Sequence, residues 1–175
     1  STSRARPLTT GSTSMTSGNT HPAGTNPQAP QPPAGSGRPK RPDHAITVNF
    51  RAGLHQCDPL AVVWHGRYFE WLEQARTELF RSVDLAVPAM MALGCKMFVV
   101  DASCRYMAPI VYDQHVAITA WFRQAAPLIK VAYDVYNLDA DRWSARAVTV
   151  LATTDVQGNL HSTTPDGILA RLPVS

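Results

Sequence analysis

The chain has 175 residues, with 16 Lys or Arg against 13 Asp or Glu, but this small positive excess is distributed unevenly. Residues 1–42 contain five basic residues, no acidic residue, eight of the 14 prolines and 13 Ser or Thr, so residues 43–175 carry a formal charge of −2. The positive total is therefore no argument for a nucleic-acid-binding fold, and no run approaches 18 apolar residues, which excludes a membrane-spanning helix.

The first 42 residues are predicted to be a disordered tail. They contain no aromatic residue and almost no large aliphatic one, so they cannot bury enough apolar surface to offset the entropy of ordering. They lack the apolar segment of a secretory signal. Their basic and hydroxyl residues resemble a transit peptide, but their prolines and glycines disfavour the amphipathic helix that such a peptide needs. Residues 43–175 suffice for one domain with one core.

The three cysteines, Cys57, Cys95 and Cys104, form no CxxC pair. An odd count is atypical of a secreted disulfide framework, and their wide separation is atypical of a metal site, which uses closely spaced ligands. We therefore expect reduced thiols, a cytoplasmic location and no bound metal.

The first predicted element of the domain is a strand over residues 45–52. Ile46, Val48 and Phe50 alternate with polar residues, which is the pattern of a half-buried strand. Residues 53–63 form a connection. Residues 84–95, which contain Pro88 and Gly94, are read as a second connection without regular structure.

Between these connections, residues 66–83 are predicted to form a long amphipathic helix. Apolar residues recur at helical spacing over about five turns, at Tyr68, Phe69, Leu72, Ala75, Leu79, Phe80 and Val83. Ion pairs at i,i+3 spacing, Glu73–Arg76 and Glu78–Arg81, are expected on its wetter side.

Four further strands are predicted over residues 96–106, 115–123, 129–137 and 145–154, followed by a helical turn over residues 165–172. Short turn signals rich in Pro, Asp and Gly separate the strands, so we expect an antiparallel sheet. One helix covers one face of such a sheet and leaves most of the second face and at least one edge open. We expect a second copy to pair along that edge, giving at least a homodimer.

Standard motifs for a nucleophile, a phosphate or a metal are missing, including GxSxG, GxxxxGK[ST], GxGxxG and HExxH. The densest group of reactive side chains is instead His55, Cys57 and Asp58, in the connection that leads to His65 at the helix start. This connection meets the unpaired N–H groups of a helix N-terminus, which attract negative charge. The arrangement favours carbonyl chemistry, in which N–H groups polarise the oxygen while a carboxylate attacks the carbon or activates water.

Residues 50–81 resemble the 4-hydroxybenzoyl-CoA thioesterase family of hot-dog-fold acyl-CoA thioesterases. The shared pattern is an aspartate, a short apolar turn, an aromatic residue or His with Tyr three residues on, and then E-x-A-R. In this chain it falls on Asp58, Val62, Val63, His65, Tyr68, Glu73, Ala75 and Arg76. The resemblance covers about residues 45–172 and implies an α+β hot-dog fold, with a long central helix wrapped by a five-stranded antiparallel sheet.

The resemblance further implies hydrolysis of an acyl-CoA to a free acid and CoA without a cofactor. Asp58 matches the catalytic carboxylate, as nucleophile or general base, and the backbone N–H near His65 matches the donor to the thioester oxygen. The residues expected to contact substrate are Val63, Trp64, Gly66 and Tyr68. Active sites are expected at the interface of a homodimer, or of a homotetramer built from two dimers. The family commonly has Gly where this chain has Ala61, so the turn or the acyl pocket is expected to differ.

Other interpretations remain open at this point. Cys57 is a possible thiol nucleophile with His55 or His65, and Glu73 a possible second carboxylate. Four residues suit the border of an acyl pocket, namely Trp64, Trp71, Met90 and Met91. The thioester carrier is either CoA or an acyl carrier protein, and the domain is alternatively a non-catalytic module that binds acyl thioesters.

Overall fold

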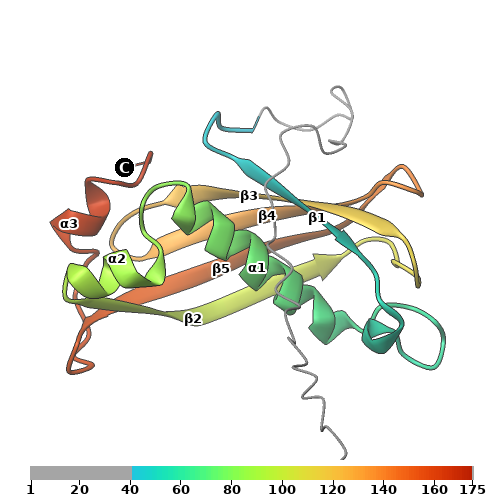
Figure 1. Ribbon diagram of the computed structural model, residues 1–175, viewed down its shortest axis with the longest axis horizontal. Helices are drawn as coiled ribbons and strands as arrows, with labels where there is room; N and C mark the ends of the chain where they lie inside the picture. The colour runs from blue at the N-terminus through green and yellow to red at the C-terminus, as the bar shows by residue number, and fades with distance from the viewer. Residues whose placement is uncertain (1–40, 175) are drawn as a thin grey trace, which may run out of the picture.

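The computed structural model describes residues 41–174, so the predicted tail lies almost wholly outside the described residues. The chain forms β1 (Ile46–Arg51), the 3-10 turns η1 (Leu54–Gln56) and η2 (His65–Arg67), α1 (Tyr68–Arg81), α2 (Val87–Ala92), β2 (Cys95–Tyr106), β3 (His115–Gln124), β4 (Ile129–Asn137), β5 (Arg142–Asp155) and α3 (Asp166–Leu169). The strands make one antiparallel sheet in the order β1-β3-β4-β5-β2, and α1 lies across one face (Figure 1). The predicted α+β architecture is confirmed.

The core lies between α1 and the face of the sheet that it covers. The buried side of α1 consists of Tyr68, Trp71, Leu72, Ala75, Leu79 and Phe80. Trp71 stacks on Phe50 of β1 with ring centres 6.0 Å apart, and Phe80 meets Phe122 of β3 edge-on at 5.1 Å. Burial of each such large side chain stabilises the fold by about 1.5–3 kcal/mol. This packing holds the helix so that its N-terminus faces the connection from β1.

Two local predictions differ from the structure. The first is α2, which forms where an irregular connection was expected. Pro88 is compatible with this helix because it sits in the first turn, where its missing N–H costs nothing. The ion pair between Glu78 and Arg81 is present, but within residues 41–174 none joins Glu73 to Arg76.

The second face of the sheet is less open than expected. Ala117, Thr119 and Asp134 on this face are all less than 8% exposed. Arg41 lies over it, with its guanidinium 5.2 Å from the ring centre of Trp143 and 3.5 Å from the Asp134 carboxylate.

The exposed edge of the sheet is β2, in agreement with the expectation that at least one edge is open. Phe98, Val99 and Val100 are 46%, 38% and 49% exposed on this 12-residue edge strand. The ladder between β2 and β5 skips Val100, which is the extra residue of a β-bulge. A long exposed edge with three consecutive apolar residues is a surface that pairs readily with another strand.

Candidate active site

Asp58 begins a tight reversal of the chain between β1 and α1. The Ala61 N–H donates to the Asp58 carbonyl at 2.9 Å, the Asp58 N–H donates to the Val62 carbonyl at 2.8 Å, and Cys57 bridges to Val63. Asp at the first position and Pro59 at the second are the residues that such a turn favours. The residue that closes a three-residue hairpin loop takes a left-handed backbone, and Ala61 accordingly has φ 60°.

That conformation explains why glycine is common at this position in the family that the sequence resembles, since glycine takes a positive φ without steric cost. Ala61 adopts the same backbone despite its Cβ. We expected the Cβ of Ala61 to shift the turn or narrow the acyl pocket. The side chain is instead exposed and does not line the cavity. The cost of alanine here is local strain rather than a smaller pocket.

The Asp58 carboxylate is held by its own turn. Its Oδ1 accepts the Leu60 N–H at 2.9 Å and the Val62 N–H at 3.3 Å. Within the described part of the chain, no hydrogen bond reaches Oδ2, and the side chain is only partly buried. One oxygen is therefore fixed in place while the other remains available to a ligand.

The helix start lies beside this turn and is anchored on both sides. The Val63 N–H donates to the Ile110 carbonyl at 2.8 Å, and the Trp64 N–H donates to the Gln56 carbonyl at 2.9 Å. Trp64 precedes η2, which runs directly into α1. The N–H groups of His65 and Gly66 open this continuous helical segment, so the helix itself offers them no acceptor. They carry the positive end of the helix dipole.

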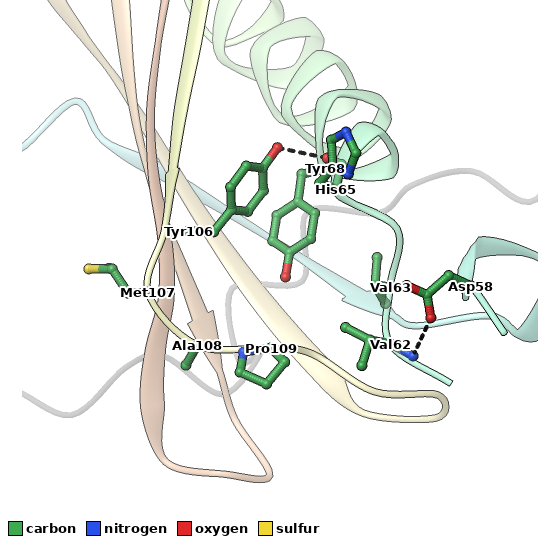
Figure 2. A pocket seen from close by; sticks show the side chains of 9 residues that line it. All are labelled: Asp58, Val62, Val63, His65, Tyr68, Tyr106, Met107, Ala108 and Pro109. Carbon is green, nitrogen blue, oxygen red and sulfur yellow. Dashed lines mark hydrogen bonds between the residues drawn. The ribbon is translucent and has the colours of Figure 1, made fainter. Parts of the chain in front are cut away.

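Asp58 and the helix start border one cavity of about 380 Å³ (Figure 2). Its lining is Asp58, Val62, Val63, His65, Tyr68, Tyr106, Met107, Ala108 and Pro109. The first five residues come from the turn and the helix start, and the last four come from the end of β2 and the segment after it. The cavity thus combines the Asp58 carboxylate, the helix start at His65 and an apolar wall.

Two tyrosines form the wall between the helix and β2. The Tyr106 hydroxyl donates to the His65 carbonyl at 2.8 Å, and the Tyr106 ring meets the Tyr68 ring edge-on at 5.0 Å (Figure 2). Burial, reinforced by nearby Cys104, raises the pKa of Tyr68 to about 12. The pKa of Tyr106 is raised as well, mainly by desolvation and then by the nearby Cys104. Both phenols therefore stay protonated at neutral pH.

The structure brings together four of the six predicted site residues at the cavity: Asp58, Val63, His65 and Tyr68. Trp64 and Gly66 are outside the lining. The Trp64 ring lies 4.7 Å from the His65 ring and covers Gly66 so closely that a Cβ at that glycine would be 2.1 Å from it. The four lining residues after Tyr68 were not predicted as site residues.

Several alternative site residues lie elsewhere. The Cys57 thiol donates to the Gly53 carbonyl at 3.6 Å and does not line the cavity. Trp71 is 2% exposed in the core, and Met91 is an exposed residue of α2. Among residues 41–174, no three His, Cys, Asp or Glu side chains gather into a possible metal site, and none of the helices is long and apolar enough to cross a membrane.

Met90 and Glu73 border a second cavity, of about 220 Å³, between α1, α2 and β2. Its lining is mainly apolar and includes Phe80, Leu85, Val87, Met97 and Phe98. Phe98 and Tyr106 are eight residues apart on one strand, or about 26 Å. The two cavities therefore open at opposite ends of β2.

Comparison with known proteins places this architecture. The model of the thioesterase superfamily matches residues 60–143. The crystal structure of a 1,4-dihydroxy-2-naphthoyl-CoA thioesterase from Synechocystis has a TM-score of 0.64 at 17% identity, covering 73% of this chain and 95% of that one. For a DHNA-CoA thioesterase from Staphylococcus aureus the TM-score is 0.61 at 20% identity, covering 67% and 79%. The fold is a hot dog.

The hot-dog assignment confirms the fold predicted from the sequence. Among curated proteins, the chain is 38% identical over 71 residues to “Putative esterase sll0410” of Synechocystis sp., which is 41% of this chain and 43% of that protein. The chain thus matches less than half the length of this relative. The finer resemblance to the 4-hydroxybenzoyl-CoA family stays a prediction.

Proposed function

We propose that this hot-dog domain is an acyl-CoA thioesterase with Asp58 as its catalytic carboxylate. The observation that carries the proposal is the shared cavity, which is bordered both by Asp58, whose Oδ2 is available, and by His65 at the helix start. A carboxylate beside preorganised N–H donors is the arrangement that thioester hydrolysis needs. The match to the thioesterase superfamily supports the same reaction class.

In the proposed reaction, the thioester carbonyl binds with its oxygen toward the N–H groups of His65 and Gly66. Asp58 then either attacks the carbonyl carbon or removes a proton from a water that attacks it. Negative charge that develops on the carbonyl oxygen is stabilised by the helix N–H groups. If Asp58 attacks, the C–S bond breaks to leave a mixed anhydride on Asp58, which a water molecule then hydrolyses; if water attacks, the C–S bond breaks directly. In both cases water supplies the hydroxyl of the free acid, and the proton that the water loses ends on the thiol of CoA.

Two copies of the chain are proposed to complete the site by pairing along β2. Antiparallel pairing of the two β2 edges about a two-fold axis would bury Phe98, Val99 and Val100. It would also bring the Phe98 end of one copy beside the Tyr106 end of the other. The apolar second cavity of one subunit would then adjoin the carboxylate cavity of its partner, where an acyl chain has to lie.

The decisive variant for the reaction is Asp58→Asn. The amide oxygen of asparagine can still accept the Leu60 and Val62 N–H groups, so the turn is preserved while the negative charge is lost. Thiol release from acyl-CoA is expected to fall by orders of magnitude, with the oligomer intact, because a central catalytic group is removed. The matched control is Asp155→Asn, which changes the same atoms in another turn, where Asp155 accepts the Asn159 N–H at 2.9 Å.

Retention of more than about a tenth of the activity by Asp58→Asn would contradict the role of this carboxylate. The same assay, run with short, long and aromatic acyl groups linked to CoA and to acyl carrier protein, identifies the acyl group and the carrier. Tight binding of acyl-CoA by the wild type without thiol release would instead support a non-catalytic module.

A further inference from the structure

Tyr106 occupies a position in which it acts on the backbone of the helix start. Its hydroxyl donates to the His65 carbonyl at 2.8 Å, across 41 residues of sequence. A carbonyl cannot donate, so the direction of this hydrogen bond is certain. It is the link between the end of β2 and the first turn of the helix (Figure 2).

The accepting carbonyl belongs to the same planar peptide group as the Gly66 N–H. A hydrogen bond to the oxygen of an amide withdraws electron density and makes its N–H a stronger donor, by about 10–30%. The bond also fixes the plane of this peptide, which matters because glycine gives the backbone more rotational freedom than other residues. Both effects act on an N–H group that the proposed reaction uses.

We infer that Tyr106 is a positioning residue that orients and polarises the His65–Gly66 peptide, so that the Gly66 N–H stabilises the negative charge on the thioester oxygen. This inference rests on the proposed function. Tyr106 need not touch the reacting atoms, because it acts through the peptide.

The surroundings of Tyr106 fit this role. Its ring is clamped by the edge-on contact with Tyr68 at 5.0 Å and by the His65 ring at 6.3 Å. Raised by burial, the pKa of Tyr106 keeps the phenol protonated, so the donor is present throughout the neutral range. A group that served only as apolar lining would not need a hydroxyl on this carbonyl.

The test compares Tyr106→Phe with the wild type on acyl-CoA. Loss of a direct oxyanion donor lowers kcat by about 10²–10³, so weakening one such donor is expected to lower kcat by about tenfold, with KM within about twofold. Tyr136→Phe is the matched control, because it removes the hydroxyl of a β4 tyrosine that donates to Asp141 in the turn before β5, away from the cavity. It is expected to leave both constants unchanged.

An independent readout observes the peptide itself. His65–Gly66 is the only His-Gly pair in the sequence, so labelling histidine with carbonyl ¹³C and glycine with ¹⁵N gives a single carbonyl–amide correlation in the NMR spectrum. Tyr106→Phe should move both the His65 carbonyl and the Gly66 amide resonances upfield. Tyr136→Phe should move neither.

The inference is overturned if this resonance pair does not move in Tyr106→Phe, or if it moves while kcat stays within about twofold of wild type. Should Tyr106→Phe fail to fold, 3,5-difluorotyrosine at that position keeps the ring and provides a more acidic phenol. Its activity must then fall with pH earlier than that of the wild type, and an unchanged pH profile also overturns the inference. If Asp58→Asn is fully active, the proposed function fails, whereas an active Tyr106→Phe beside an inactive Asp58→Asn contradicts only the role of Tyr106.

Discussion

Ala61 offers a sharp test of how the turn that carries Asp58 is built. Its φ of 60° lies in the left-handed region, where the Cβ of an L-residue approaches the following carbonyl. This conformation costs alanine about 1–2 kcal/mol. Ala61→Gly removes that cost, and since the side chain is exposed it removes little packing.

The gain is partly offset in the unfolded chain. Glycine has more conformational freedom to lose on folding, which costs about 0.4–1 kcal/mol. The net expectation is that Ala61→Gly stabilises the domain by about 0.5–1 kcal/mol. For a folded region of this size, that raises the melting temperature by about 2–4 °C.

Thermal and urea unfolding of Ala61→Gly and of Ala92→Gly measure the effect. Ala92 is also exposed but lies in α2, where glycine is expected to destabilise by about 0.5–1 kcal/mol. The same chemical change should therefore have opposite signs at the two positions. If Ala61→Gly destabilises the domain as Ala92→Gly does, then the left-handed backbone is not what determines the cost of alanine in this turn.

Three further outcomes are expected. Gly66→Ala should displace the Trp64 ring, since the new Cβ would be 2.1 Å from it. We expect the free energy of unfolding measured in urea to fall by about 1–2 kcal/mol and the tryptophan fluorescence to change. An unchanged fluorescence spectrum would contradict the contact. Val100→Lys should dissociate the proposed dimer in analytical ultracentrifugation, because it charges the β2 edge. Leu160→Lys, at a residue 66% exposed outside β2, should not. A Val100→Lys variant that is still dimeric would argue against pairing along β2. Stability should fall as the pH rises from about 10 to 12. The reason is that burial raises the pKa of Tyr68 to about 12 in the folded protein, while the unfolded chain releases this proton near 10. Urea unfolding at several pH values measures this dependence of stability on pH, and Tyr68→Phe should weaken it.

The sequence predicts most of the fold and four of the nine cavity residues because their signals are local. The apolar spacing of α1 spans the whole helix, and the Asp-Pro pair that opens the reversal is a turn signal in itself. Asp58, Val63, His65 and Tyr68 are close together along the chain, so one local pattern brings them to one place. α2 was not predicted because it has only six residues, with Pro88 near its start, and so short a segment shows no recognisable helical spacing of apolar residues.

Tyr106 and the residues after it could not be assigned in the same way, and the reason is the bulge at Val100. Before the bulge, Cys95 and Met97 pack against the core, so strict alternation along β2 would direct residue 105 inward and residue 106 outward. The ladder instead pairs Val99 with Leu151 and Asp101 with Val150, leaving Val100 extra. One additional residue inverts the alternation. From there on the even-numbered positions face inward, so Cys104 packs against the core and Tyr106 reaches the His65 carbonyl. The same bulge residue is exposed at the edge proposed to pair with a second copy, so a single irregularity sets both the phenol in the cavity and the surface beside it.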